Sequence, residues 1–311
     1  MNAILNSVVP LFAVIFTGYF AAKGKMLDQQ AVRGLTNYIF FFALPPLLFR
    51  LMATNEVGGT GEWQFLLVYL TTELIMLILG GALAWMVFGR GLAGMTIHGF
   101  GAAFSNTVLL GLPFVLWLYG DAGAVPALLV ITTNVATFSL VTILLEASQG
   151  RAQPGQVLTD TLKSILKNPI LMAAGIGLAY GQLDLGLPAV VDRTLSLMGQ
   201  AGAPAALFAL GATLAMQRVA GSRGPAAAII GLKLFVHPLT TWLLLGPVFD
   251  FEPIWANAGI LIASLPVGLN VFIFAQRYQV EVEVASTAIL VSTALSMVTV
   301  TVLLTILPPV P

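Results

Sequence analysis

Two apolar stretches of the chain are interrupted near their centres by glycine and proline, with an asparagine close by. The first covers residues 103–113 and the second covers residues 262–270. Without the interruption, each stretch would form one membrane-spanning helix. A break at this depth exposes backbone N–H and C=O groups that lipid cannot satisfy, so it persists only where protein or a water-filled cavity covers it. Paired breaks at corresponding places in two halves of a chain indicate the binding site of a transporter.

The chemistry that such breaks offer is the binding of a carboxylate. If both helices break, four half-helix ends converge near the middle of the bilayer. The N-terminal ends carry a partial positive charge and free N–H donors, and the C-terminal ends present carbonyl oxygens. Asn106 and Asn270 add amide groups beside these ends. We predict that both asparagines bind substrate, with hydrogen bonding between helices as the alternative role.

Other residues are predicted to shape or line the same site. The glycines and prolines set the path of the backbone, whereas the serines and two asparagines in other spans offer further polar contacts. These candidates are Ser105, Gly111, Pro113, Asn134, Ser264, Pro266, Gly268 and Asn37.

Two charged residues lie within predicted spans. A charge near the middle of a membrane is costly, and in transporters it marks an ion or proton path. We therefore predict that Glu73 is a proton-coupling or gating group, with a structural hydrogen bond or ion pair as the alternative. Lys233 lies near the cytoplasmic end of its span, where we expect its long side chain to reach the water interface, with gating as the alternative. His98 and His237 are expected only to pack or to lie at helix ends.

The composition indicates a membrane protein with little else attached. Of 311 residues, 58% are hydrophobic and 8% are charged, against about 25% charged in soluble domains. A membrane-spanning helix needs about 20 mainly apolar residues. We predict an all-α polytopic membrane protein with ten transmembrane helices, at about residues 4–22, 35–53, 64–88, 96–119, 122–146, 164–181, 190–216, 226–248, 254–276 and 284–307.

What the sequence lacks argues against several functional classes. There is no cysteine, which removes thiol catalysis, disulfides and thiolate metal sites. No metalloprotease, hydrolase or nucleotide-binding motif stands in the required structural context. We therefore expect a protein that is not an enzyme, with no cofactor, no metal site and no nucleic-acid partner.

Lysines and arginines fall almost entirely into one set of loops. The loops after odd-numbered spans hold ten of these residues, and the loops after even-numbered spans hold only Arg50 and Arg193. Loops rich in lysine and arginine stay in the cytoplasm, so we expect both termini on the non-cytoplasmic side. The even loops collect acids that we expect to be plain solvated residues: Glu56, Glu62, Asp121, Asp184, Asp192, Asp250 and Glu252.

The longest polar stretch, residues 148–156, divides the chain near its midpoint, with five predicted spans on each side. With an odd number of spans per half, the second half enters the membrane from the opposite face, so a structural repeat must be inverted. Landmarks follow the same order in both halves: prolines in spans 2 and 7, one charge in spans 3 and 8, and a break in spans 4 and 9. We predict a first repeat at 1–147, a cytoplasmic linker at 148–162 and a second, inverted repeat at 163–311.

The interrupted spans resemble those of the auxin efflux carrier family, a branch of the bile/arsenite/riboflavin transporter superfamily. This family includes plant PIN proteins and bacterial carriers named as malonate transporters. The resemblance covers the whole chain, and its markers are Val9-Pro10 through Gly18-Tyr19, Leu44-Pro45-Pro46, Asn106-Thr107, Gly111-Leu112-Pro113 and Pro266-Val267-Gly268-Leu269-Asn270. It implies crossed, broken helices 4 and 9 within two inverted five-helix repeats, a fold similar to that of NhaA and the sodium–bile acid symporters.

The resemblance also implies a carrier of elevator type. A scaffold from helices 1, 2, 6 and 7 would form a homodimer interface, and a transport domain from helices 3–5 and 8–10 would carry the substrate. The implied substrates are small organic anions, mono- or dicarboxylates such as malonate or auxin-like acids, with Asn106 at the carboxylate. The implied location is the bacterial inner membrane, and a proton is the candidate coupling ion.

The chain differs from related transporters in two features, the loop between spans 5 and 6 and the residues of span 9. Plant members of the family carry a long loop between spans 5 and 6, whereas this chain has only the short linker 148–162, as expected of a bacterial carrier. The sodium–bile acid symporters use an acid in span 9, but residues 264–276 contain no Asp or Glu, which argues against a tight sodium site. A channel, a sodium-coupled symporter and a membrane sensor remain the alternatives.

Overall fold

The computed structural model describes residues 2–54, 60–150, 159, 163, 165–217 and 223–307. These residues are almost entirely helical, and their only β-structure is one isolated bridge. The predicted loop residue Glu56 and most of the predicted linker 148–162 lie outside the described residues.

The first half forms long helical segments whose ends follow from local sequence. Asp28 begins the second helix because its carboxylate accepts the Ala31 N–H at 2.7 Å. A short π-helical turn then joins that helix to the next one without interruption. The elements are α1 (Asn2–Lys23), α2 (Gln29–Tyr38), η1 (Ile39–Ala43), α3 (Leu44–Thr54), α4 (Thr60–Phe88), α5 (Leu92–Ala103), η2 (Thr107–Gly111), α6 (Leu112–Tyr119), η3 (Gly120–Gly123) and α7 (Ala124–Ser148).

The second half has a similar series of helices. Asn168 begins its first helix by accepting the Ile170 N–H at 3.0 Å, and Pro169 occupies the first helical position, where no N–H is needed. The elements are α9 (Pro169–Gly181), α10 (Ala189–Gln200), α11 (Gly202–Ala215), α12 (Arg223–Gly231), η4 (Leu232–Val236), α13 (His237–Leu243), η5 (Leu244–Val248), α14 (Pro253–Ala263), α15 (Leu269–Tyr278) and α16 (Val282–Ile306).

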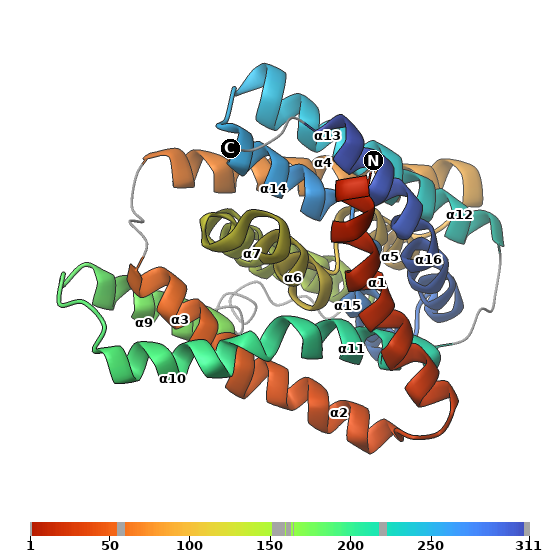
Figure 1. The fold of residues 1–311 in the computed structure, drawn as a ribbon. Helices are drawn as coiled ribbons and strands as arrows, with labels where there is room; N and C mark the ends of the chain where they lie inside the picture. Colours follow the sequence, from red (N-terminus) through yellow and green to blue (C-terminus); the bar gives the residue numbers. More distant parts are fainter. Residues whose placement is uncertain are drawn as a thin grey trace.

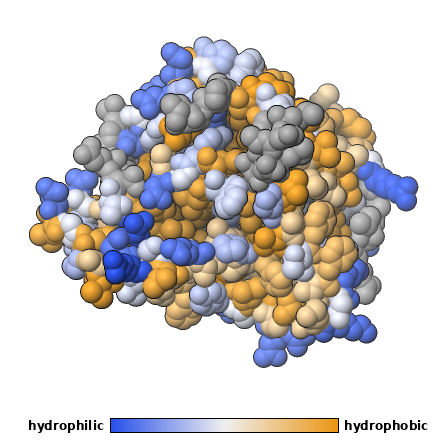
Figure 2. All heavy atoms as spheres, viewed as in Figure 1, coloured by the Kyte–Doolittle hydropathy of each residue, from blue (hydrophilic) through white to orange (hydrophobic). Residues whose placement is uncertain are grey.

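The helices have the length and surface of a multi-pass membrane protein. Among the described residues, six helical segments are long and apolar enough to cross a bilayer: Gln29–Thr54, Gly61–Phe88, Thr107–Ser148, Ala189–Ala215, Arg223–Val248 and Val282–Ile306. Three shorter apolar helices accompany them: Val8–Lys23, Pro169–Gly181 and Pro253–Ala263. Figure 2 shows hydrophobic residues spread over much of the visible surface, as expected of side chains that face lipid.

Close helix crossings hold the fold together. In Figure 1, α1 crosses α11, and α2 and α10 run beside them along the lower edge of the view. At the crossing of α1 with α11, a Cβ added to Gly18 would collide with the Phe208 carbonyl, and one added to Gly211 would collide with the Ile15 carbonyl. Small residues let membrane helices approach this closely. Elsewhere α3 packs on α9 and α10, α4 packs on α5 and α7, and α12 packs on α16.

Candidate functional site

Both predicted breaks are present in the structure. The helix α5 ends at Ala103 and helical structure resumes at Thr107. In the same way, α14 ends at Ala263 and α15 begins at Leu269. The residues between these ends are buried, so their backbone groups need partners other than water.

The two broken segments supply those partners to each other. The Asn106 N–H donates to the Pro266 carbonyl at 3.1 Å, and the Gly268 N–H donates to the Phe104 carbonyl at 3.0 Å. These two hydrogen bonds flank a single antiparallel β-bridge. Pairing between segments far apart in sequence therefore explains how both helices stay broken inside an apolar protein.

The bridge joins Ser105 to Val267. Because the flanking residues make the hydrogen bonds, the backbone groups of this pair point away from each other. Val267 N–H donates instead to the Ser292 hydroxyl of α16 at 3.1 Å. The Ser105 carbonyl accepts the Thr107 N–H at 2.8 Å, which places Asn106 at the centre of an inverse γ-turn with φ −76° and ψ 67°.

Glycine and proline at the breaks shape this crossing. A Cβ on Gly268 would collide with the Phe104 ring, so only glycine permits the close approach of the two segments. A Cβ on Gly111 would lie 3.2 Å from a Leu265 methyl group, tighter than ordinary packing. Pro113 lies in the first turn of α6, directly after the π-helical turn η2.

Each resumed helix begins within two residues of the bridged pair and leaves N–H donors free. Among the described residues, no hydrogen-bond partner is present for four backbone N–H groups at the starts of η2 and α15, those of Val108, Leu109, Leu269 and Asn270. The side-chain amide of Asn106 is likewise unpartnered within the described chain, although it is only 6% exposed. Asn270 is partly exposed in the first turn of α15. Free donors at helix N-termini suit an anion.

Lys233, on η4, is buried and reaches the crossing. Its Nζ lies 2.6 Å from the Ala263 carbonyl, 2.8 Å from the Ser105 hydroxyl and 3.0 Å from His237 Nδ1. Three acceptors match the three N–H donors of an ammonium group. Since Ala263 ends α14, the positive charge also lies at a helix C-terminus, where cations are stabilised.

The expectation that Lys233 extends to the water interface is therefore wrong. The side chain is 0% exposed, because the break in α14 provides acceptors at the depth of the lysine. His237, expected only to pack, contacts the ammonium group through its ring nitrogen. Ser105, predicted as a polar contact for substrate, uses its hydroxyl to accept a hydrogen bond from Lys233.

Glu73 is buried on α4 and is bound by two hydroxyls of α7. Thr137 Oγ1 donates to Oε2 at 2.6 Å. Thr133 Oγ1 lies 3.2 Å from Oε1 and shares its single hydrogen with the Val130 carbonyl at 2.8 Å. The carboxylate also interacts electrostatically with Lys233, although the two groups form no direct ion pair in the described structure. The single acid and single base found in equivalent predicted spans thus face the same buried region.

Two buried polar atoms near these residues have no partner within the described chain. They are Asn134 Oδ1 on α7 and His237 Nε2 on α13, and the buried Tyr69 hydroxyl of α4 interacts with Ser105. The rings of Tyr69 and His237 lie 6.3 Å apart, centroid to centroid. Tyr69 was not predicted from the sequence, although its position one turn before Glu73 places both side chains on one face of α4. Unpaired buried polar atoms of this kind indicate a place for water or ligand.

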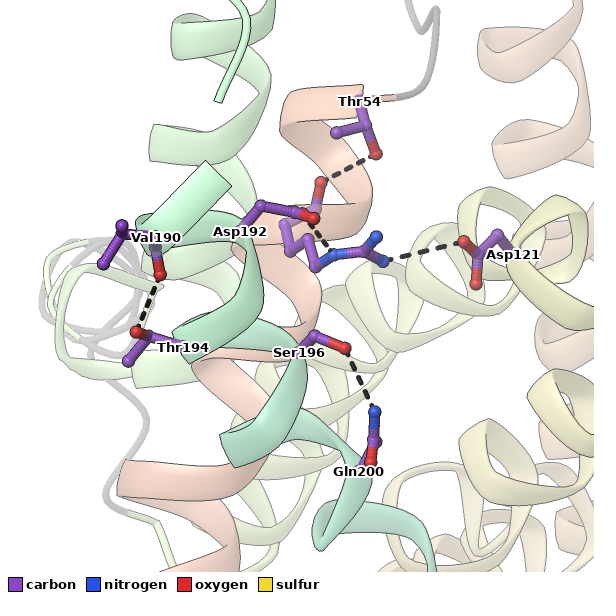
Figure 3. Close-up of polar contacts among 8 residues, drawn as sticks. Thr54, Asp121, Val190, Asp192, Thr194, Ser196 and Gln200 are labelled. Carbon is purple, nitrogen blue, oxygen red and sulfur yellow. Dashed lines mark hydrogen bonds and ion pairs between the residues drawn. The ribbon is translucent and has the colours of Figure 1, made fainter. Parts of the chain in front are cut away.

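A separate polar network lies at the end of α3. Arg50 Nε lies 2.6 Å from Asp192 Oδ1 on α10, and Arg50 Nη1 lies 3.8 Å from Asp121 Oδ2 in η3 (Figure 3). Both acids were expected to be plain solvated residues. Asp121 is 67% exposed, as expected, whereas Asp192 is 34% exposed and accepts a hydrogen bond from the arginine. The network connects α3 and α10 to the turn between α6 and α7.

Comparison with known proteins identifies the family. A family model described as "Membrane transport protein" matches residues 3–304, nearly the whole chain. The chain belongs to this family. Membership of the membrane transport protein family confirms the predicted resemblance to the auxin efflux carriers. The crossing therefore lies in a transporter that spans a membrane several times.

Relatives of this membrane transport protein include bacterial and plant proteins. A protein of Rhizobium meliloti (strain 1021) named "Putative malonate transporter" is 33% identical over 306 residues, covering 98% of this chain and 96% of that protein. The "Auxin efflux carrier component 8" of Arabidopsis thaliana is 21% identical, covering 92% of each chain. The "Uncharacterized transporter YfdV" of Escherichia coli (strain K12) is 25% identical, covering 93% and 92%.

Proposed function

We propose that this membrane transport protein is a secondary transporter of small organic anions, mono- or dicarboxylates such as malonate or auxin-like acids. The observation that carries the proposal is the paired break at the crossing of α5–α6 with α14–α15. There, free N–H donors at two helix starts accompany an unpartnered, buried Asn106 amide. A carboxylate supplies the acceptors that these donors lack.

The proposed roles of the site residues follow from their contacts. Asn106 and Asn270 donate to the substrate, and Asn134 offers an unpartnered Oδ1 on α7, which packs on η2. The backbone path depends on Gly111, Pro113, Pro266 and Gly268. Ser105 links the crossing to the buried lysine.

Glu73 and Lys233 are proposed as the coupling or gating pair. The Lys233 ammonium group binds the Ala263 carbonyl at the end of α14 and the Ser105 hydroxyl. A sodium ion would otherwise use these two oxygens. This occupancy supports a sodium-independent carrier over a sodium-coupled symporter. Glu73, bound only by hydroxyls, is the candidate proton carrier.

The proposed mechanism is an elevator within ten spans arranged as two inverted five-helix repeats, 1–147 and 163–311. The scaffold consists of α1, α2–α3, α9 and α10–α11, and the transport domain consists of the remaining helices. Helix packing supports this division, since α1 packs on α11 and α3 packs on α9 and α10, whereas α4 packs on α5 and α7. We further propose a homodimer through the scaffold, in a bacterial inner membrane, with both termini on the non-cytoplasmic side.

The names of two relatives agree with a carboxylate substrate. Malonate carries two carboxylates and auxin carries one, and proteins named for each of them are similar to this chain along almost its full length. A site built from helix ends and amides recognises the carboxylate that these compounds share.

The test is binding and uptake of labelled malonate by the purified protein in liposomes. We expect Asn106→Ala to abolish saturable binding, because it removes the buried amide at the crossing. The matched control is Asn37→Ala. Asn37 was predicted to line the site, but its amide is exposed on α2, so this variant should leave binding unchanged. Malonate binding that survives Asn106→Ala at full affinity would contradict the proposed site.

A second measurement separates the carrier from a channel. A carrier saturates and shows counterflow, in which unlabelled substrate on one side of the membrane drives uptake of label from the other. An ohmic single-channel current carried by malonate would contradict the proposed mechanism.

A further inference from the structure

The buried ammonium group of Lys233 has the surroundings of a bound monovalent cation. Its acceptors come from three separate segments: the Ala263 carbonyl that ends α14, the Ser105 hydroxyl in the first break and His237 Nδ1 on α13. The distances to Nζ, between 2.6 and 3.0 Å, are those of hydrogen bonds. All three acceptor residues are themselves buried, so the ammonium group is held by protein atoms on every one of its N–H donors.

Helix dipoles do not by themselves select a cation at this place. Two helix ends and two helix starts meet at the crossing, so their partial charges largely offset one another. The preference for a cation comes from the three contacting acceptors and from the Glu73 carboxylate, which interacts electrostatically with Lys233.

The acid and the base occupy equivalent places in the two halves of the chain. Glu73 precedes Ala103, the last residue of α5, by the same interval at which Lys233 precedes Ala263, the last residue of α14. The first half therefore places a negative charge near the crossing, and the second half places the cation there.

The acceptors favour an ammonium ion over sodium. An ammonium group can only donate hydrogen bonds, so His237 Nδ1 accepts one from Lys233. Hard cations such as sodium prefer oxygen ligands, whereas an N–H group bonds equally to the ring nitrogen, the carbonyl and the hydroxyl. Three acceptors also match the three donors of a primary ammonium ion.

We propose that the crossing contains a binding site for a primary ammonium ion, and that Lys233 fills this site from within the chain. Cutting the side chain back to alanine opens the site to a primary alkylammonium ion from solution. The buried acceptors that lose their donor make the open site costly to leave unoccupied. The inference goes beyond the proposed function, because it does not depend on which substrate the crossing carries.

The experiment measures thermal unfolding of the purified, full-length Lys233→Ala variant with increasing n-propylammonium. This probe is chosen because its carbons and nitrogen replace the Cγ, Cδ, Cε and Nζ atoms that the substitution removes. A ligand that binds only the folded state stabilises it. We expect the unfolding midpoint to rise saturably toward that of the wild type, by about 5 °C or more at a concentration of about 100 times the Kd.

The matched control is Lys233→Met, whose side chain keeps the site filled without a charge. n-Propylammonium should not raise the unfolding midpoint of this variant or of the wild type. In Lys233→Ala, neutral 1-propanol and sodium ions should each give no saturable rise, because the first has no charge and the second cannot donate to His237.

A second variant tests one of the acceptors directly. Ser105→Ala in the Lys233→Ala background removes the hydroxyl that the ammonium ion would contact. We expect the Kd of n-propylammonium to rise by about tenfold or more, because a hydrogen bond to a charged group is lost. An unchanged Kd would contradict the assignment of this site.

The remaining outcomes are equally decisive. An equal effect of n-propylammonium on Lys233→Ala and Lys233→Met would contradict the inference, as would an equal effect of 1-propanol or sodium on Lys233→Ala. So would a Lys233→Ala variant that yields no folded protein even with n-propylammonium present from membrane extraction onward. If the wild type fails to bind malonate while n-propylammonium stabilises Lys233→Ala, the proposed carboxylate site is wrong and the ammonium site stands.

Discussion

Replacing Lys233 by methionine removes the ammonium group and keeps most of the buried volume. The change leaves acceptors on Ser105, Ala263 and His237 without their donor. A buried acceptor left unpaired costs about 1–3 kcal/mol, and breaking a buried charge pair costs about 3–5 kcal/mol. These costs do not add in full, because the Ser105 hydroxyl can rotate and Glu73 can take up a proton. We therefore expect a net loss of about 3–5 kcal/mol in stability.

The assay is thermal unfolding in detergent, followed by the fluorescence of the five tryptophans. Lys23→Met is the matched control, because that lysine is exposed in the last turn of α1, and we expect it to unfold near the wild-type midpoint. The double variant Glu73→Gln with Lys233→Met removes both charges and should recover part of the loss. If Lys233→Met unfolds with the control, the lysine does not hold the crossing together and the reasoning fails.

Two further predictions concern the backbone approach and the motion between helix groups. Gly268→Ala should abolish malonate uptake, because its Cβ would collide with the Phe104 ring. The control Gly34→Ala should transport normally, because a Cβ at this position meets nothing within 4 Å. Equal uptake by both variants would show that the close approach of the two segments is dispensable. Since the chain has no cysteine, Arg50→Cys with Asp121→Cys can be joined by a reducible bifunctional reagent. Joining them should stop transport until reduction, and a joined protein that still transports would contradict relative motion at this contact.

The position of the second break was predictable from sequence, because Pro266 and Gly268 lie between the end of α14 and the start of α15. The position of the first break was predicted less well. Gly111 and Pro113 lie in η2 and α6, inside the helix that resumes at Thr107, whereas the break itself is Phe104-Ser105-Asn106. The pairing of the two breaks through a β-bridge was not predictable, since it depends on contacts between segments that lie far apart in the sequence.

The environment of Lys233 shows why the partners of the charged residues could not be predicted from the sequence. Its position near the end of a predicted span favoured a side chain that reaches water. Its acceptors lie on Ser105 and Ala263, which are 128 and 30 residues away, and only the folded chain brings them together. The same holds for Glu73, whose threonine partners lie on α7, and for the pairing of Arg50 with acids from two other segments.

The most direct test of carboxylate binding at the crossing is a structure of the protein with malonate bound. We predict a carboxylate at the crossing, within hydrogen-bond distance of the Asn106 amide and of the free N–H groups that begin α15. A carboxylate found elsewhere, with these donors still unpaired or bound only to water, would contradict it.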